Sequence, residues 1–157
     1  MSLPAMPRLS HSAYLRLIRA SAVYDMAQIL PFATPWTFAL LYAQLSRLNV
    51  WFGAAPLPAF QTVHLLLATL LGTLVLTWTS CRLSAPSLRL GRFDAGARLV
   101  FAVWIGWAML AADMPMLWVF LVPEIVWGGA QCWPVAPPSE PRTAATHRSA
   151  AVPLAQP

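Results

Sequence analysis

The chain has 157 residues, of which 59% are hydrophobic and 10% charged, and its mean hydropathy is +0.62. This composition is too apolar for an ordinary water-soluble domain, and the length allows one compact domain with tails but not two. The net charge of +5 comes from arginines that flank apolar segments and do not cluster on a polar face, so it does not indicate nucleic-acid binding.

Apolar residues concentrate in four stretches, each near or above the roughly 20 residues that a helix needs to cross a bilayer. The stretches cover Ala20–Arg47, Ala59–Cys81, Ala97–Asp113 and Met114–Trp133. Every arginine except Arg47 lies before the first stretch, around the junction of the second and third, or after the fourth. Because cytoplasmic loops carry excess positive charge, both termini should be cytoplasmic. The sequence therefore predicts an all-α, polytopic membrane protein: a four-transmembrane-helix bundle of a bacterial inner membrane.

The predicted organisation has three parts. Residues 1–19 form a cytoplasmic N-terminal segment, residues 20–133 the transmembrane domain, and residues 134–157 a disordered cytoplasmic tail rich in Pro, Ala, Ser and Thr. Within the first part, the run Ser10–Arg19 is expected to be either an interfacial helix or the first turns of the first spanning helix. Pro31 and Pro35 each remove a backbone donor, so that helix should kink or break around Leu30–Thr34.

The middle loop is expected over Arg82–Arg92, followed by a helix that begins at Asp94. A carboxylate suits that position because it accepts hydrogen bonds from first-turn amides at the positive end of a helix. The last two spans should form a tight hairpin around Asp113–Pro115, with the proline at the first turn of the final helix.

Ionisable side chains inside the apolar stretches are the best candidates for a functional site, because a charge at mid-bilayer costs at least ~2.5–3.5 kcal/mol. Three meet this condition: Asp25, His64 and Glu124. Glu124 and His64 are expected to line a polar cavity between helices. Its aromatic wall would come from Trp104, Trp107, Trp118 or Trp127. Apolar walls with a few convergent polar groups suit a lipid-like or quinone-like ligand.

Each candidate also has a purely structural interpretation. Glu124 would then be protonated and hydrogen-bond neighbouring helices, and His64 would make one structural bond near the interface. Asp25 would pair with an arginine at the cytoplasmic face. The arginines available there are Arg16, Arg19, Arg82 and Arg98. Asp94 and Arg98, four residues apart on one helix, should form a surface ion pair.

The sequence contains no complete catalytic motif and no metal-ligand spacing. Its two cysteines, Cys81 and Cys132, are expected at cytoplasmic helix ends, where thiols stay reduced, and they are too few for a zinc site. No metal site is therefore predicted, and the sequence names no cofactor.

Two segments carry a resemblance to known proteins. They are Tyr24-Asp25 followed by Pro31–Trp36 (PFATPW), and Gly91–Arg98 (GRFDAGAR). These resemble signatures of a family of small bacterial four-span inner-membrane proteins, and the architecture is more remotely similar to DoxX-like proteins. The resemblance implies a partner linked to quinone-dependent oxidoreductases, but it transfers no catalytic residue. The residues to which it draws attention are Asp25, Pro31, Pro35, Arg92, Asp94 and Arg98.

The sequence leads to two main functional hypotheses. The first is a non-enzymatic membrane component that binds a lipid-like ligand or stabilises a complex with a membrane protein partner or a second copy of itself. The alternative is a small membrane enzyme acting on an isoprenoid or quinone-like substrate, with Glu124 or Asp25 as acid or base. A transporter is the least favoured class, because the spans are few and carry no internal repeat.

Overall fold

A computed structural model describes residues 7–137. The described part consists of helices and connecting loops, without a β-strand, so the predicted all-α class is confirmed there. The elements are α1 (His11–Ile29), η1 (Leu30–Ala33), α2 (Pro35–Trp51), α3 (Thr62–Ser84), α4 (Leu88–Ala111), η2 (Pro115–Leu117) and α5 (Trp118–Gln131), where η denotes a short 3-10 helix.

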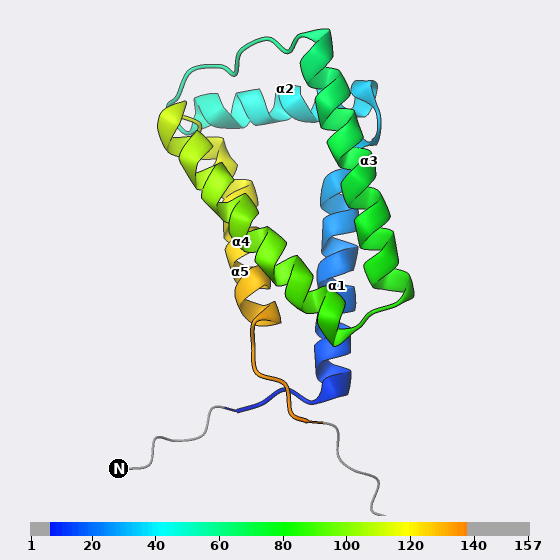
Figure 1. Cartoon of the computed structure of the whole chain (residues 1–157). Coiled ribbons are helices and arrows are strands. Elements are labelled where there is room, and N and C mark those ends of the chain that lie inside the picture. Colours follow the sequence, from blue (N-terminus) through cyan, green and yellow to red (C-terminus); the bar gives the residue numbers. More distant parts are fainter. Residues whose placement is uncertain (1–6, 138–157) are drawn as a thin grey trace, which may run out of the picture.

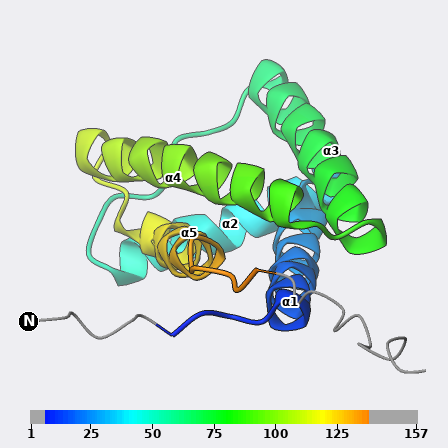
Figure 2. The same ribbon diagram turned by 60° about the horizontal axis from the view of Figure 1, so that its bottom comes forward.

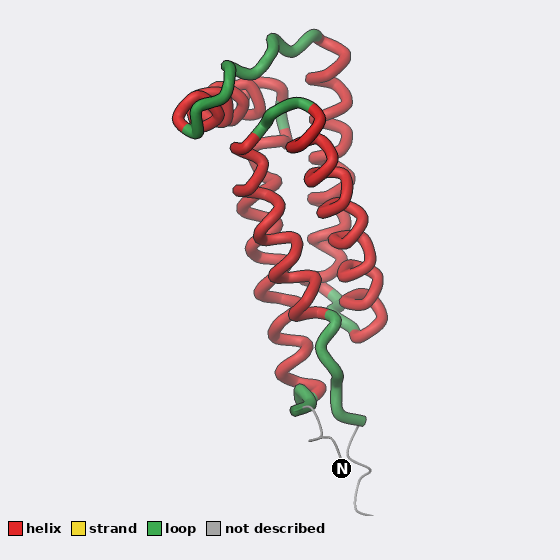
Figure 3. Tube along the Cα trace, turned by 90° about the vertical axis from the view of Figure 1, so that its left-hand side faces the viewer, coloured by secondary structure: helices red, strands yellow, loops and turns green. Residues whose placement is uncertain are grey.

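Four of the α-helices run back and forth along the molecule, and α2 lies across one end (Figure 1). α1 packs mainly on α3, and α4 packs mainly on α5. Turning the molecule shows α2 almost end-on, projecting from the bundle (Figure 3), while the beginning of α1 and the end of α5 lie at the opposite end (Figure 2). At that end Leu9 and Val135 form an isolated bridge between the two described termini.

The predicted break in the first apolar stretch is confirmed. α1 ends at Ile29, η1 carries the chain past Pro31, and Thr34 is extended with φ −138° and ψ 153°. The Thr34 hydroxyl accepts from the amide of Thr37 at 3.2 Å and so caps α2, whose first residue is Pro35. The first apolar stretch is therefore divided between α1 and α2, because the proline pair redirects the chain.

The N-terminal run Ser10–Arg19 is not a separate element but the N-cap and first turns of α1. α1 begins at His11, and the hydroxyl of Ser10 accepts from the amide of Ala13 at 3.2 Å. The predicted tail lies outside the described residues from 138 onward, as do residues 1–6 of the N-terminal segment.

The expected loop Arg82–Arg92 and the expected helix start at Asp94 are both wrong. Arg82 lies in the last turn of α3, and α4 begins at Leu88. Ser87 provides the cap, because its hydroxyl accepts from the amide of Leu90 at 3.2 Å. Asp94 therefore does not cap α4 but lies buried in its second turn.

The hairpin around Asp113–Pro115 is present. Asp113 has the positive φ of 49° that reverses the chain, and Pro115 opens η2, which leads into α5. Asp and Asn are the residues that adopt this left-handed conformation most readily after glycine.

Gly72 allows α3 to pass directly against the break between α1 and α2. A Cβ at this position would lie 2.6 Å from both the Cβ and the carbonyl oxygen of Phe32. Gly72→Ala should therefore lower the free energy of unfolding by about 1–3 kcal/mol, since close-packed backbone leaves no room for a methyl group. Thermal unfolding of the purified protein in detergent measures this change.

Gly106→Ala is the matched control, because a Cβ there would meet nothing within 4 Å. Helix propensity alone favours that change by up to about 1 kcal/mol. Equal midpoints for the two variants would contradict the close approach of α3 to Phe32.

Candidate functional site

Five ionisable side chains meet in the interior, and together they are called the charge cluster below. Its members are Asp25 of α1, Arg82 of α3, Asp94 and Arg98 of α4, and Glu124 of α5. Four helices thus each contribute at least one charged group to one place. Ions taken out of water are retained only when they are paired and hydrogen-bonded, so the contacts inside the cluster decide its stability.

Arg98 connects all three carboxylates. Its Nε donates to Asp94 Oδ2 at 3.0 Å, its Nη1 donates to Glu124 Oε2 at 3.0 Å, and its Nη2 pairs with Asp25 Oδ2. Only 3% of the Arg98 side chain is exposed. A planar guanidinium with donors in a fixed fork is the side chain best suited to bridge several carboxylates.

Arg82 closes the cluster from the side of α3. Its Nη1 donates to Asp94 Oδ2 at 2.5 Å, and its Nη2 pairs with Asp25 Oδ2 and donates to Thr79 Oγ1 at 3.2 Å. Only 1% of its side chain is exposed, although it lies in the last turn of its helix. Asp25 and Asp94 each therefore contact both arginines.

Neutral polar groups surround the carboxylate of Asp94. Gln131 Nε2 donates to Asp94 Oδ2 at 2.9 Å and to Ser21 Oγ at 2.7 Å, while Trp78 Nε1 donates to Asp94 Oδ1 at 2.9 Å. Two buried atoms here have no hydrogen-bond partner in the described structure, Arg82 Nε and Gln131 Oε1. The network holds both oxygens of Asp94: Oδ2 accepts from Arg82, Arg98 and Gln131, and Oδ1 accepts from Trp78.

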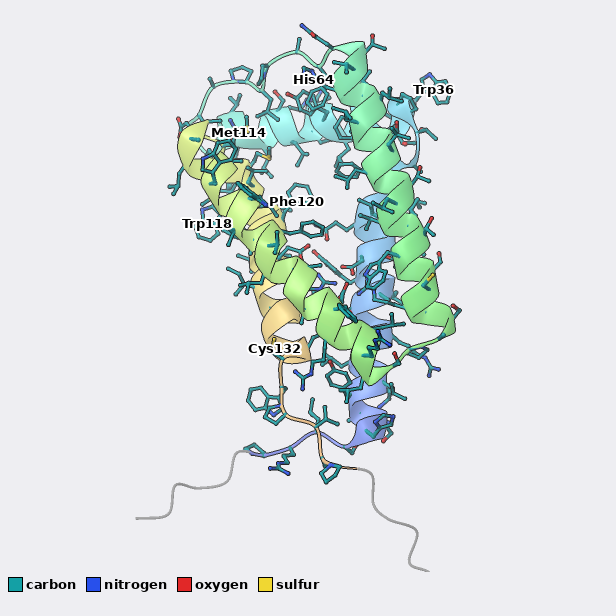
Figure 4. The ribbon with its side chains drawn as sticks, viewed as in Figure 1. Trp36, His64, Met114, Trp118, Phe120 and Cys132 are labelled. Carbon is teal, nitrogen blue, oxygen red and sulfur yellow. The ribbon has the colours of Figure 1, made fainter. Side chains whose placement is uncertain are left out.

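An apolar cavity of about 760 Å³ lies beside the charge cluster, which forms one end of its wall. Apart from Gln28 of α1, the rest of the wall is aliphatic or aromatic and comes from every helix. Its aromatic residues are Phe32, Phe38, Tyr42, Phe60, Trp78, Phe101, Trp104 and Phe120. In Figure 4, Phe120 points toward the space between the helices, while Trp118 points away from it. The volume and composition match sites for small apolar molecules.

Comparisons with protein-family models, with curated proteins and with solved structures give no match to this chain. The resemblance to DoxX-like proteins stays a prediction. What the site can do chemically rests on its own geometry.

The structure brings most of the sequence-predicted site residues together. Asp25 and Glu124 both contact Arg98 and both line the cavity. Asp94 and Arg98 pair as expected for residues four apart, but the pair is buried and not on the surface. Arg19 is exposed and forms no ion pair with any residue of 7–137.

His64 lies apart from this group, near the end of the molecule where α2 crosses (Figure 4). It is exposed in the first turn of α3, where its Nδ1 accepts from the amide of Gln61 at 3.2 Å. His64 therefore caps its helix and does not line the cavity with Glu124. Of the predicted aromatic wall only Trp104 lines the cavity, and Trp78 was not expected there.

The sequence offers Arg82 as one of four candidate ion-pair partners of Asp25, and that pair is present, but it did not predict Arg82 or Gln131 beside Asp94. A signal was present: Trp78 and Arg82 are four residues apart, as are Asp94 and Arg98, so each pair shares one helix face. Within residues 7–137, no group of three or more His, Cys, Asp or Glu side chains is placed to hold a metal ion. The arginines occupy the positions between the carboxylates where a cation would otherwise lie.

Proposed function

We propose that this chain is a multi-pass protein of the bacterial inner membrane that holds a lipid-like or quinone-like molecule in its cavity, as a non-enzymatic component of that membrane. The observation that carries the proposal is the combination of an apolar cavity of about 760 Å³ with a charge cluster at its end. The apolar wall would hold the body of the molecule, and the cluster would orient its polar head.

The distribution of side chains supports the membrane location. The largest fully buried side chains include Arg82, Gln131, Asn49, Thr79 and Ser21, while many leucines, valines and tryptophans of α3 and α4 are exposed. α3 and α4 are long and apolar enough to cross a bilayer, yet only 11% and 17% of their apolar windows are buried. Such apolar surfaces are not left open to water by stable monomers, but lipid covers them without cost.

Two further helices complete the proposed set of four spans. α1 and α5 run between the same two ends as α3 and α4 (Figure 1). α1 has 19 residues. The 3 residues of η2 and the 14 residues of α5 together form a second helical segment of similar length. At 1.5 Å per residue, each is roughly 25–28 Å long, close to the apolar thickness of a bilayer. An even number of spans places both termini on one side, the cytoplasmic side by the distribution of arginines.

Native mass spectrometry of the protein, extracted gently from its host membrane, tests the proposed function. A bound small molecule is expected in the wild-type protein. Ala97 lines the cavity, so Ala97→Phe should fill part of it and reduce the bound fraction at least about tenfold, as one misplaced ring excludes a ligand from a close-packed site. Ala111→Phe, at the exposed end of the same helix, should leave binding unchanged.

Equal ligand content in Ala97→Phe and Ala111→Phe would contradict the cavity as the binding site. Recovery of a stable protein partner or a second copy, without any small molecule, would replace the proposal with an accessory role in a complex.

A second candidate is a small membrane enzyme acting on an isoprenoid or quinone-like substrate. It is favoured by one observation: Asp25 and Glu124 both line the cavity, and each uses only one carboxylate oxygen for its ion pairs. The free oxygens are placed to accept a proton from a bound molecule. If this is correct, the mass of the bound molecule should change with time in the wild-type protein and stay constant in Glu124→Gln.

A further inference from the structure

The charge cluster presents hydrogen-bond acceptors to the cavity. Asp25 Oδ1 and Glu124 Oε1 accept no hydrogen bond from any residue of 7–137, whereas Asp25 Oδ2 and Glu124 Oε2 are held by Arg98. Both carboxylates belong to the cavity wall. A molecule in the cavity thus meets free carboxylate oxygens at its polar end.

Most N–H donors of the two arginines are already bonded within the cluster. Each Nη atom of Arg82 donates to two oxygens. Its third nitrogen, Nε, is buried and has no hydrogen-bond partner in the described structure. Every nitrogen of Arg98 donates one hydrogen bond to a carboxylate, which leaves one N–H on each Nη atom without a partner among residues 7–137, and the side chain is almost fully covered. The two arginines are therefore directed mainly at the three carboxyl groups, although both also belong to the cavity wall.

The charges of the cluster agree with this division. Two guanidinium groups meet three carboxyl groups, so the acidic groups of the cluster outnumber the basic ones by one. In an apolar surrounding, an anionic head beside this excess would be repelled more strongly than it would be in water. A neutral head that donates a hydrogen bond meets no such opposition.

We infer that the cavity selects an apolar chain ending in an uncharged hydrogen-bond donor, the hydroxyl of an isoprenoid alcohol or of a quinol, and rejects the corresponding phosphate. This inference rests on the proposed function, because it specifies the head of the molecule that the cavity holds. The hydroxyl donates to Glu124 Oε1 or Asp25 Oδ1, and the chain lies along Phe101, Trp104 and Phe120.

Competition between two probes that differ only in the head tests the inference. The full-length protein in phosphatidylcholine nanodiscs is mixed with equal concentrations of farnesol and farnesyl phosphate, and native mass spectrometry measures the bound fraction of each. Farnesol should exceed farnesyl phosphate at least about tenfold, since a like-charge contact in an interface costs more than one factor of ten in affinity.

Glu124→Gln removes the excess negative charge and keeps the size of the side chain, so it should reduce the preference for farnesol severalfold. Asp113→Asn is the matched control: Asp113 is exposed in the hairpin, is not part of the cavity wall, and has a positive φ that asparagine tolerates. It should keep the full preference.

Each other outcome contradicts a different statement. Equal binding of the two probes, or tighter binding of farnesyl phosphate, would overturn the selection of a neutral donor and leave the cavity as a binding site. An equal loss of preference in Asp113→Asn and Glu124→Gln would overturn the role of the cluster in that selection. Binding of neither probe, in a protein that folds, would overturn the proposed function together with the inference.

Discussion

Arg82→Met should destabilise the protein by about 3–5 kcal/mol, the cost of removing one partner from a buried ion network. Arg82 donates to Asp25 and Asp94, whose carboxylates are themselves buried. Methionine fills a similar volume but leaves Arg98 as the cationic partner of all three carboxyl groups of the cluster. Thermal unfolding of the purified protein in detergent, followed by gel filtration, measures the loss.

Arg16→Met is the matched control for this prediction, because Arg16 lies exposed in the second turn of α1 and forms no ion pair with any residue of 7–137. The free energy of unfolding of this variant should differ from that of the wild type by less than about 0.5 kcal/mol, as is usual for exposed positions. If the two variants unfold at the same temperature, the buried network does not stabilise the protein.

A second substitution separates charge balance from lost packing. Adding Asp94→Asn to Arg82→Met removes one negative charge from the unbalanced cluster. Part of the lost stability should return, because neighbouring members of one network are not additive. A double variant that is less stable than the sum of the single changes would contradict charge balance as the reason.

Local chemistry explains what could be predicted about the fold. The break after Ile29 follows from Pro31 and Pro35, because a proline lacks the amide that continues a helix, and Thr34 supplies the hydroxyl that starts the next one. The hairpin at Asp113–Pro115 follows from an aspartate that tolerates a positive φ and a proline that suits the first turn of a helix. Both features depend on a few adjacent residues, so the sequence contains them directly.

The charge cluster depends on tertiary contacts, and only its members could be proposed in advance. Asp25 and Glu124 were identified because charges are rare in apolar stretches, but their common partner, Arg98, lies on a third helix. Arg82 was assigned to a loop because the chain there turns polar and reaches Pro86. Only the packing of α3 on α1 shows that it points inward, where 1% of its side chain remains exposed.

His64 illustrates the opposite error. A histidine in an apolar stretch predicts an inward-facing polar group, yet its depth depends on where the helix begins, and α3 begins at Thr62. Gln61 and His64 have the three-residue spacing of a capping box. The side chain of each residue accepts a hydrogen bond from the backbone amide of the other. This local capping pattern, and not the apolar stretch around it, predicts the observed position of His64 at the start of α3.

Cysteine labelling should place the two ends of the bundle on opposite sides of the membrane. Cys132 follows α5 at the end that holds both described termini (Figure 4), and the loop 52–61 joins α2 to α3 at the other end (Figure 1). In intact spheroplasts a membrane-impermeant maleimide should label Ala55→Cys, made in a background of Cys81→Ser and Cys132→Ser. It should not label Cys132 in Cys81→Ser until the membrane is opened.

This prediction has a near all-or-none readout, because a charged reagent does not cross the apolar core of a bilayer. Labelling of both positions in intact spheroplasts would place the two ends of the bundle on one side and overturn the four-span arrangement. Labelling of Cys132 alone would keep four spans and reverse their orientation, against the distribution of arginines. Cys132 and Ala55 are both exposed in the described structure, so burial within the protein does not imitate protection by the membrane.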